Sequence, residues 1–380
     1  MAGTFSFPHD VPTLTDGDVT LRAHRLSDVD EMMVQCRDPE SIRWTTVPTP
    51  FERANAVSYI KEIVPGGWHT NRDLGFAVEA EHADGQRKFS GSMSLRPMDD
   101  GAAEIAFGLH PGARGRGVAR RAVNLLLDWG FNQLNLDVVV WYANVDNWAS
   151  WRVAWATGFS FHGTVESFLN QRGERRDAWC GSLRAAEPRE PRHEWHVAPT
   201  LSSDRLRLRP FRPEDAPRIE EAVNDERTKE FVGTAPVIGQ SGETFIRRQL
   251  EADAKGERYN WCIADRATDQ LLGHIQLFGL SGLDKTAAEL GYVVHRDARG
   301  KGVLTEALTL VTEWAFRRKE EGGMGGRRLF LGTAGTNKAS RHAAEKAGYV
   351  HIGTHPEAFP TATGFDDEVV YHQLNPLWTE

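Results

Sequence analysis

The sequence has few cysteines, no secretion signal and no long apolar run. Three cysteines occur in 380 residues, and Cys36, Cys180 and Cys262 lie far apart. An odd number of widely spaced cysteines provides neither a disulfide framework nor a paired set of metal ligands. The chain does not begin with a basic segment followed by an apolar run, and no apolar stretch approaches the roughly 20 residues of a membrane span. We therefore expect a cytoplasmic protein with no membrane partner and no metal.

An excess of positive charge is also missing. The chain has 45 Lys and Arg against 53 Asp and Glu, for a net charge of −8. Because proteins that bind along nucleic acid need many basic side chains for the phosphates, we expect no nucleic-acid partner. An apolar content of 40% and a charged content of 26% are typical of a globular protein, which we expect to be a monomer or a homodimer.

What the sequence does contain is a long internal repeat. The segment "AEIAFGLHPGARGRGV" at 103–118 matches "AELGYVVHRDARGKGV" at 288–303, and "NWASWRVAWATGF" at 147–159 matches "NKASRHAAEKAGY" at 337–349. A repeat this long is a duplicated domain rather than an element of a solenoid. A charged, proline-containing stretch without periodicity separates the copies. The predicted organisation is a domain at 1–184, a linker at 185–197 and a second domain at 198–380.

Each copy has the same predicted order of elements. In the first copy, helices are expected at 28–36, with Ser27 as the N-cap, and at 52–64. Alternating apolar residues then predict three strands, and apolar residues at helical spacing predict a long helix from Val118 onward. A further strand, a short helix and two strands follow. This order predicts an α/β (α+β) fold in which helices flank a mixed central sheet.

The glycine-rich loop before the long helix predicts an anion site. Free backbone N–H groups and the helix dipole attract negative charge at a helix N-terminus, and glycine lets a phosphate approach the backbone. The arginines and the lysine of the two loops are expected to add positive charge at the rim, so a diphosphate fits best; the alternative is an exposed helix start. The spacing matches neither a nucleotide P-loop nor a dinucleotide loop, because Arg120 and Thr305 stand where the latter needs glycine or alanine.

The remaining pattern is Arg-x-x-Gly-x-Ala at 114–119 and Arg-x-x-Gly-x-Leu at 299–304. It resembles the coenzyme A pyrophosphate loop of the GNAT N-acyltransferases, and the Asn-x-x-Ser helices resemble the branch that acetylates ribosomal-protein N-termini (Rim-type). The resemblance implies two tandem GNAT folds, acetyl-CoA as cosubstrate and no metal. It also implies a set of cofactor-binding residues: Leu109, Arg114, Gly115, Arg116, Gly117, Val118, Ala119 and Asn147 in the first copy, and Val294, Arg299, Gly300, Lys301, Gly302, Val303, Leu304 and Asn337 in the second.

The same resemblance implies direct transfer of an acetyl group to an amine in a ternary complex. It places an oxyanion-stabilising backbone N–H near Leu109 and Val294 and a proton donor to the leaving thiolate at Ser150 and Ser340. These serines could instead only cap their helices or contact coenzyme A. Glu104 and Glu289, at matching strand positions, are candidate general bases or else solvated edge carboxylates. Glu166 and Glu357, each in a Glu-x-Phe motif, are rival bases.

The acceptor amine is not encoded in a recognisable motif. Trp44 and Trp68 in the first copy and Phe231 in the second lie where the family builds its substrate cleft, although aromatic residues usually pack in the core. The leading hypothesis is an N-acetyltransferase acting on a protein N-terminus, an antibiotic or a small metabolite. Alternatives are one catalytic domain with a scaffold domain, or a non-catalytic acyl-CoA sensor. Ala119 and the tryptophans favour the first copy as the catalytic one.

Overall fold

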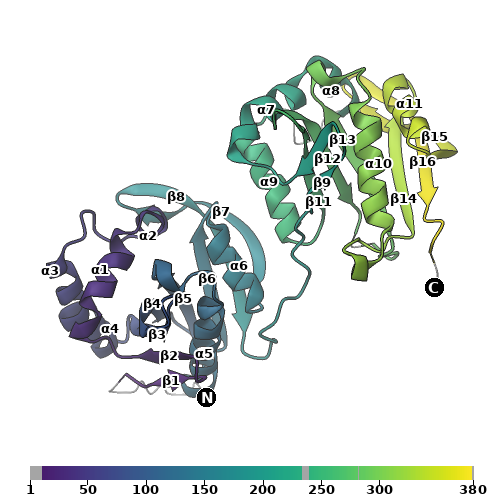
Figure 1. Cartoon of the computed structure of the whole chain (residues 1–380). Helices are drawn as coiled ribbons and strands as arrows, with labels where there is room; N and C mark the ends of the chain where they lie inside the picture. The colour runs from purple at the N-terminus through teal and green to yellow at the C-terminus, as the bar shows by residue number, and fades with distance from the viewer. Residues whose placement is uncertain (1–10, 233–238, 281, 379–380) are drawn as a thin grey trace. The chain divides into compact units, whose positions relative to one another are not determined.

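The computed structural model describes residues 11–232, 239–280 and 282–378, and the chain forms two compact units, Met1–Arg192 and His193–Glu380. Each unit has one eight-stranded mixed sheet with helices on both faces (Figure 1). This architecture confirms the predicted α/β class.

The sheet of the first unit has the order β1-β2-β3-β4-β5-β6-β8-β7. Neighbours pair antiparallel except β5 and β6, which are parallel because a helix connects them. The strands are β1 (Leu14–Thr15), β2 (Val19–Arg22), β3 (Leu74–Glu81), β4 (Arg87–Pro97), β5 (Ala102–Leu109), β6 (Val138–Asn144), β7 (Ser160–Gln171) and β8 (Glu174–Arg184).

The second unit repeats this order as β9-β10-β11-β12-β13-β14-β16-β15, and its parallel pair is β13 and β14. The strands are β9 (Leu201–Ser202), β10 (Leu206–Arg209), β11 (Tyr259–Asp265), β12 (Leu271–Phe278), β13 (Ala287–Val294), β14 (Arg328–Ala334), β15 (Val350–Thr361) and β16 (Gly364–Leu374).

The helices also correspond between the units. The first has α1 (Val29–Arg37), α2 (Pro39–Trp44), α3 (Arg53–Ser58), α4 (Val64–His69), α5 (Val118–Gln133) and α6 (Trp148–Ala156). The second has α7 (Ala216–Asn224), α8 (Glu226–Val232), α9 (Gly242–Ala254), α10 (Val303–Phe316) and α11 (Lys338–Lys346). In the second unit, α10 and α11 cover one face of the sheet and α7 and α9 the other, so each face has its own apolar core (Figure 1).

Both helical segments expected near the start of the first copy are present, but the N-cap of the first and the end of the second differ from the expectation. Ser27 lies inside a 3-10 turn, Leu26–Asp28, and Asp28 is the N-cap residue of α1. The Asp28 carboxylate accepts a hydrogen bond from the Arg25 N–H at 2.8 Å and pairs with Arg22 at 2.8 Å, so it closes the turn that precedes the helix. The helix expected at 52–64 is α3, a π-helical turn at Tyr59–Ile63 and α4, which together continue to His69.

The segment between the domains has no helix or strand and packs onto both units in turn. Arg189 pairs with Asp128 at 2.9 Å, and Arg192 donates to the Gly158 carbonyl of the first unit at 3.0 Å. Farther along, the His196 N–H donates to the Asp253 carbonyl of the second unit at 2.9 Å. The boundary between the two compact units therefore lies inside the segment predicted as a linker.

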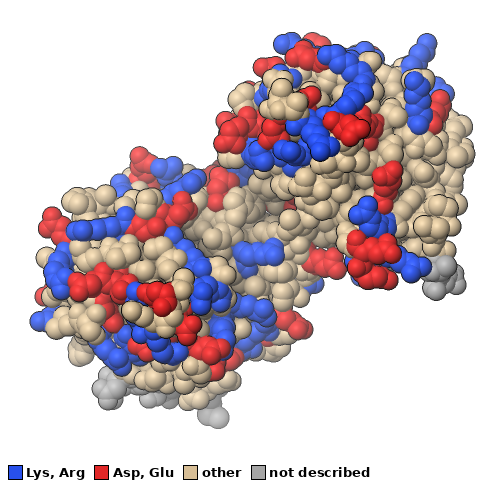
Figure 2. Space-filling model, in the orientation of Figure 1, with Lys and Arg blue, Asp and Glu red and all other residues tan. Residues whose placement is uncertain are grey.

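Charges of both signs are interspersed on the visible face of each unit (Figure 2). Many of them pair, as Arg121 does with Asp16 and Asp18. Among the described residues, none of the helices is long and apolar enough to cross a membrane.

Candidate active site

The site begins where the two parallel strands of each sheet separate. Pairing between β5 and β6 ends at Ile105 and Trp141, although both strands continue. Pairing between β13 and β14 ends in the same way at Glu289 and Phe330. Beyond these residues the two strands of each pair are no longer hydrogen-bonded to each other, so the sheet opens there. Leu109 and Val294, the predicted oxyanion positions, end the diverging strands β5 and β13.

The glycine loops lead from these strand ends to the long helices. Gly117 and Gly302 occupy the N-cap positions of α5 and α10 with φ of 77° and 76°. A Cβ on either glycine would meet no atom within 4 Å, so the backbone conformation and not the available space requires glycine here. No side chain caps either helix, which leaves first-turn N–H groups available for an anion.

The first arginine of each loop does not lie free at the rim of the loop, as expected, but is paired with an aspartate. Arg114 pairs with Asp38 at 2.7 Å and donates to the Leu109 carbonyl at 3.2 Å. Arg299 likewise pairs with Asp225 at 2.6 Å and donates to the Val294 carbonyl at 3.2 Å. These arginines therefore tie the loop to the strand end and to a neighbouring helix, and the expectation that they supply free rim charge is corrected.

The aspartates that hold these arginines also cap helices. Asp38 accepts from the Ser41 N–H of α2 at 3.0 Å, and Asp225 accepts from the Thr228 N–H of α8 at 3.2 Å. Burial alone would raise the pKa of Asp38 and Asp225, but the arginine hydrogen bonds, the arginine charge and the backbone hydrogen bonds together outweigh it and lower both. Both carboxylates are therefore ionised at neutral pH.

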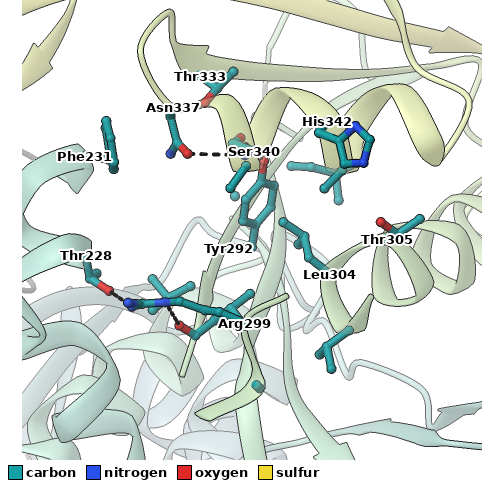
Figure 3. Close-up of a pocket in the computed structure, with 18 of the residues that line it drawn as sticks. Thr228, Phe231, Tyr292, Arg299, Leu304, Thr305, Thr333, Asn337, Ser340 and His342 are labelled. Atoms are coloured by element: carbon teal, nitrogen blue, oxygen red, sulfur yellow. Dashed lines mark hydrogen bonds between the residues drawn. The ribbon is translucent and has the colours of Figure 1, made fainter. Parts of the chain in front are cut away.

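In the second unit the diverging strands open into a cavity of about 840 Å³. Its walls are β13, β14, the glycine loop, α8 and α11 (Figure 3). Nine of the predicted residues line it: Phe231, Val294, Arg299, Gly300, Gly302, Val303, Leu304, Asn337 and Ser340. Lys301 instead lines a smaller hollow of about 150 Å³ beside the loop. In the first unit, the exposed Arg116 side chain lies 3.9 Å from Glu81, and Val118 and Ala119 begin α5.

The two candidate serines have the same backbone setting. The side-chain oxygens of Asn147 and Asn337, which cap α6 and α11, accept from the Ser150 and Ser340 N–H groups, each at 3.2 Å. The asparagines, and not the serines, are thus the caps.

The hydroxyl groups of these serines have different partners. The Trp141 indole N–H donates to Ser150 Oγ at 3.0 Å. Ser340 Oγ is instead hydrogen-bonded to the phenol of Tyr292 from β13, which reaches it across the cavity wall (Figure 3).

The candidate bases also differ between the units. Glu104 pairs with Arg96 at 3.1 Å. Glu289 lies near Glu368 of β16: a Cβ placed on Gly332 would lie 3.6 Å from Glu289 Oε1 and 2.7 Å from Glu368 Oε1. Burial raises the pKa of Glu289, and the Glu368 carboxylate raises it further. A carboxyl with a raised pKa is better suited to accept a proton near neutral pH.

The predicted aromatic substrate residues separate into different environments. Trp68 is buried, donates to the Gly75 carbonyl at 2.9 Å and packs on Phe76 and Trp129, so its assignment to a substrate cleft is wrong. Trp44 is half-buried, and its indole N–H donates to Glu40 at 2.7 Å. Phe231, as noted, lines the second cavity.

The two Glu-x-Phe motifs are not equivalent in the structure. Ser167 and Glu357 share a positive φ, and their N–H groups donate to Asp177 and Asp367 at 2.9 and 3.0 Å. Glu166 is therefore offset by one residue from Glu357. Both glutamates are exposed on the outer strands β7 and β15.

Sequence reasoning missed Tyr292, Glu368 and Thr228. Tyr292 and Ser340 are 48 residues apart, and the aligned residue of the first copy is Phe107, so no repeated motif pointed to the tyrosine. Glu368 has no acidic counterpart in the first copy, where strand pairing places Ala178. Thr228 receives a hydrogen bond from Arg299 at 3.1 Å and lines the cavity.

One group in the first unit resembles a metal site in composition. Possible ligand atoms of Glu31, His82 and His110 lie within 4.8 Å of one another. However, the Gly112 N–H donates to His110 Nδ1 at 3.0 Å, so the neutral ring carries its proton on Nε2, the nitrogen 3.1 Å from Glu31. A protonated nitrogen cannot ligate a cation, and His110 is better explained as the N-cap of the turn before the loop.

Known proteins match both units. The model of the acetyltransferase (GNAT) domain matches residues 18–160 and 205–350. "Probable N-acetyltransferase YjcK" of Bacillus subtilis is 30% identical over 133 residues, which cover 35% of this chain and 69% of YjcK. "Uncharacterized N-acetyltransferase p20" of Bacillus licheniformis is 26% identical over 45% of this chain and 95% of its own length.

Among solved structures, RimJ of Mycobacterium smegmatis in complex with CoA-disulfide is 22% identical, with a TM-score of 0.41, over 47% of this chain and 90% of that one. The microcin C7 self-immunity acetyltransferase MccE, in complex with acetyl-CoA and AMP, is 20% identical, with a TM-score of 0.40, over 44% and 93%. Since the family model matches most of both repeats, the chain belongs to the GNAT family and is a tandem N-acetyltransferase that uses acetyl-CoA as its acetyl donor.

Proposed function

We propose that the second domain catalyses direct transfer of an acetyl group from acetyl-CoA to a primary amine in a ternary complex. The observation that carries this proposal is the cavity at the diverging strands β13 and β14, which the glycine loop and Ser340 line together. Acetyl-CoA supplies the acyl group and the thiolate leaving group. The acceptor is a protein N-terminus, an antibiotic or a small metabolite.

Glu289 accepts the proton of the attacking amine in this proposal. Its raised pKa and its place beside Gly332, which lines the cavity, support the assignment. An α-amino group, with an ordinary pKa near 8, needs only modest help to lose its proton. A carboxylate acting directly or through one water is sufficient.

The other groups act on the acyl donor. The backbone N–H groups at the start of α10, near Gly302 and Val303, bind the pyrophosphate. The positive φ of Gly302 and the absence of a side-chain cap on this helix support this role. The end of β13 near Val294 presents backbone to the developing oxyanion. Ser340, which lines the cavity, donates a proton to the departing thiolate.

The first domain binds acetyl-CoA in this scheme but does not catalyse transfer, contrary to the preference drawn from Ala119 and the tryptophans. Three differences support this division. Glu104 is engaged by Arg96, and Ala178 stands where the second domain has Glu368. Tyr142 stands where the second domain has Gly332, and its ring packs on Phe168 at 4.6 Å between centroids.

The test compares matched serine variants of the full chain. A panel of primary amines is first screened for release of free CoA. With an accepted amine, Ser340→Ala is expected to lower kcat by about 10- to 1,000-fold, because a proton donor to the thiolate acts only in the transition state. The dissociation constant of acetyl-CoA, measured by calorimetry, should stay unchanged.

Ser150→Ala is the control and should leave kcat within about twofold of wild type. A loss of rate confined to Ser150→Ala would place catalysis in the first domain. A loss in Ser340→Ala that only follows weaker acetyl-CoA binding would reduce Ser340 to a binding group.

A further inference from the structure

The most specific feature of the second cavity is a pair of hydroxyl groups in its wall. Tyr292 on β13 and Ser340 in the first turn of α11 both line the cavity, and their oxygens are hydrogen-bonded to each other. The Asn337 side chain fixes the Ser340 backbone, and the serine is buried. Figure 3 shows the Tyr292 ring directed toward Ser340.

A serine hydroxyl by itself is a poor proton donor. Its acidity is close to that of water, whose pKa is about 15.7, whereas a thiol has a pKa of roughly 8.5. Complete transfer from serine to a departing thiolate would therefore leave an unfavourable alkoxide. A phenol gives a more stable anion than serine, even with the pKa of Tyr292 raised by burial to about 12.

We propose that Tyr292 and Ser340 form a two-step proton relay that protonates the leaving thiolate of coenzyme A. This inference rests on the proposed function of the second domain. As the carbon–sulfur bond of the tetrahedral intermediate breaks, its electron pair goes to sulfur and the Ser340 proton forms the S–H bond. The Tyr292 proton moves to Ser340 Oγ, so the serine is restored and a phenolate is left.

The cycle closes without a redox partner. The amine proton has gone to Glu289, which releases it to water, and the phenolate takes a proton from water. Burial raises the pKa of Tyr292 to about 12, so the phenol is protonated at neutral pH before each turnover. The proton that it lends therefore returns quickly.

The first domain has the same serine without the relay. The aligned strand residue is Phe107, which has no proton to give. Ser150 instead accepts from the Trp141 indole N–H, a donor that does not ionise in this pH range. An ionisable partner for the serine is therefore specific to the second domain.

The test uses the full chain and an amine that the wild-type protein acetylates. Tyr292→Phe keeps the ring, as Phe107 does in the first domain, and should lower the single-turnover rate about 10- to 100-fold without weakening acetyl-CoA binding. In a Ser340→Ala background the same change should have no further effect, because residues that act as a unit are not additive.

A solvent isotope measurement separates relay from packing. The single-turnover rate is measured in mixtures of H2O and D2O and plotted against the fraction of D2O. This plot should be more strongly curved for wild type than for Tyr292→Phe, because the variant transfers one proton fewer in the step. The matched control is Tyr349→Phe, which removes a buried phenol bonded to Thr312 Oγ1 at 2.6 Å outside the cavity. It should change thermal stability but neither the rate nor the isotope curve.

Replacing Tyr292 with 3,5-difluorotyrosine keeps the hydroxyl and makes it more acidic, so the single-turnover rate should rise. This variant tests the relay even if Tyr292→Phe folds poorly. A wild-type rate in Tyr292→Phe, an unchanged isotope curve, or an unchanged rate with difluorotyrosine would overturn the relay while the proposed function stands. Failure of the wild-type protein to release CoA with every amine would overturn both.

Discussion

At the scale of single residues, the two domains share their binding groups and differ in their reactive ones. The capping asparagines, the loop glycines and the tethered arginines occur in both copies with similar distances. The partners of the serine and of the strand glutamate differ. A duplicated site keeps its phosphate loop through backbone geometry, whereas its reactivity depends on a few side chains that change independently.

Glu368 should influence the pH dependence of catalysis through its neighbour Glu289. After burial, its negative charge is the second cause of the raised pKa of Glu289. A base must be unprotonated, so activity falls as the pH falls through this raised pKa. Glu368→Gln removes the charge and should move the acid limb of the kcat/KM profile to lower pH.

Glu289→Gln should lower kcat/KM about 100-fold or more, and Glu104→Gln, in the first domain, should have little effect. An acid limb that stays in place in Glu368→Gln would show that the two carboxyls do not interact in the working enzyme.

At the scale of elements, a buried polar network joins α9 to the sheet of the second domain. His274 on β12 is hydrogen-bonded to Asn260 Oδ1 at 3.0 Å, and Asn260 donates to Asp253 of α9 at 2.5 Å. Burial lowers the pKa of His274 to about 3 and raises the pKa of Asp253 to about 8. Both side chains are thus held neutral at the centre of the domain.

This network predicts how the stability of the second domain depends on pH. A histidine with a depressed folded pKa favours the folded state above its unfolded pKa of 6.5, and this contribution is lost as the pH falls. The contribution of His274 to the free energy of unfolding should fall by up to about 1.4 kcal/mol per pH unit below 6.5, and it is measured as the difference between wild type and a variant without this histidine. Urea unfolding at pH 7, 6 and 5 measures the slope.

His274→Gln keeps a hydrogen-bond donor and should lack this slope, whereas the exposed His351→Gln should keep it. Asp253 affects the free energy of unfolding with the opposite sign. Because its carboxyl pKa is raised in the folded state, it stabilises the folded state at low pH, and this stabilisation is lost as the pH rises toward 8. Asp253 is present in both variants, so the difference between them reports His274. Equal slopes in wild type and His274→Gln would contradict the prediction.

At the scale of the whole molecule, two phosphate loops predict two binding sites in one chain. The loops share the positive-φ glycines and uncapped helices, so calorimetric titration with acetyl-CoA should give a stoichiometry near two. Gly117→Glu and Gly302→Glu each place a carboxylate where phosphate binds and should each reduce the stoichiometry to about one.

The same two variants should differ in activity. Gly302→Glu is expected to abolish release of CoA, and Gly117→Glu to retain it, because we propose that the second domain catalyses the transfer. The contrary result is that the wild-type protein binds one acetyl-CoA per chain and Gly302→Glu binds none. That result would show that the first loop does not bind acetyl-CoA.

The sequence alone determined the duplication, the α/β class and the glycine loops, because each rests on local information. Periodicity predicted the long helices, whose buried residues include Val118, Ala122 and Trp129 in the first copy and their counterparts in the second. The need for glycine at 117 and 302 follows from the backbone of a tight turn, which the spacing already indicated.

Only the tertiary structure decided which side chains meet. It buried Trp68 in the core and turned Arg114 and Arg299 toward aspartates from helices 74 to 76 residues away in sequence. It paired Tyr292 with Ser340 across 48 residues and brought Glu368 from the last strand to Glu289. The physical reason is that reactivity and charge depend on contacts across strands and helices, and the neighbours along the chain do not specify those contacts.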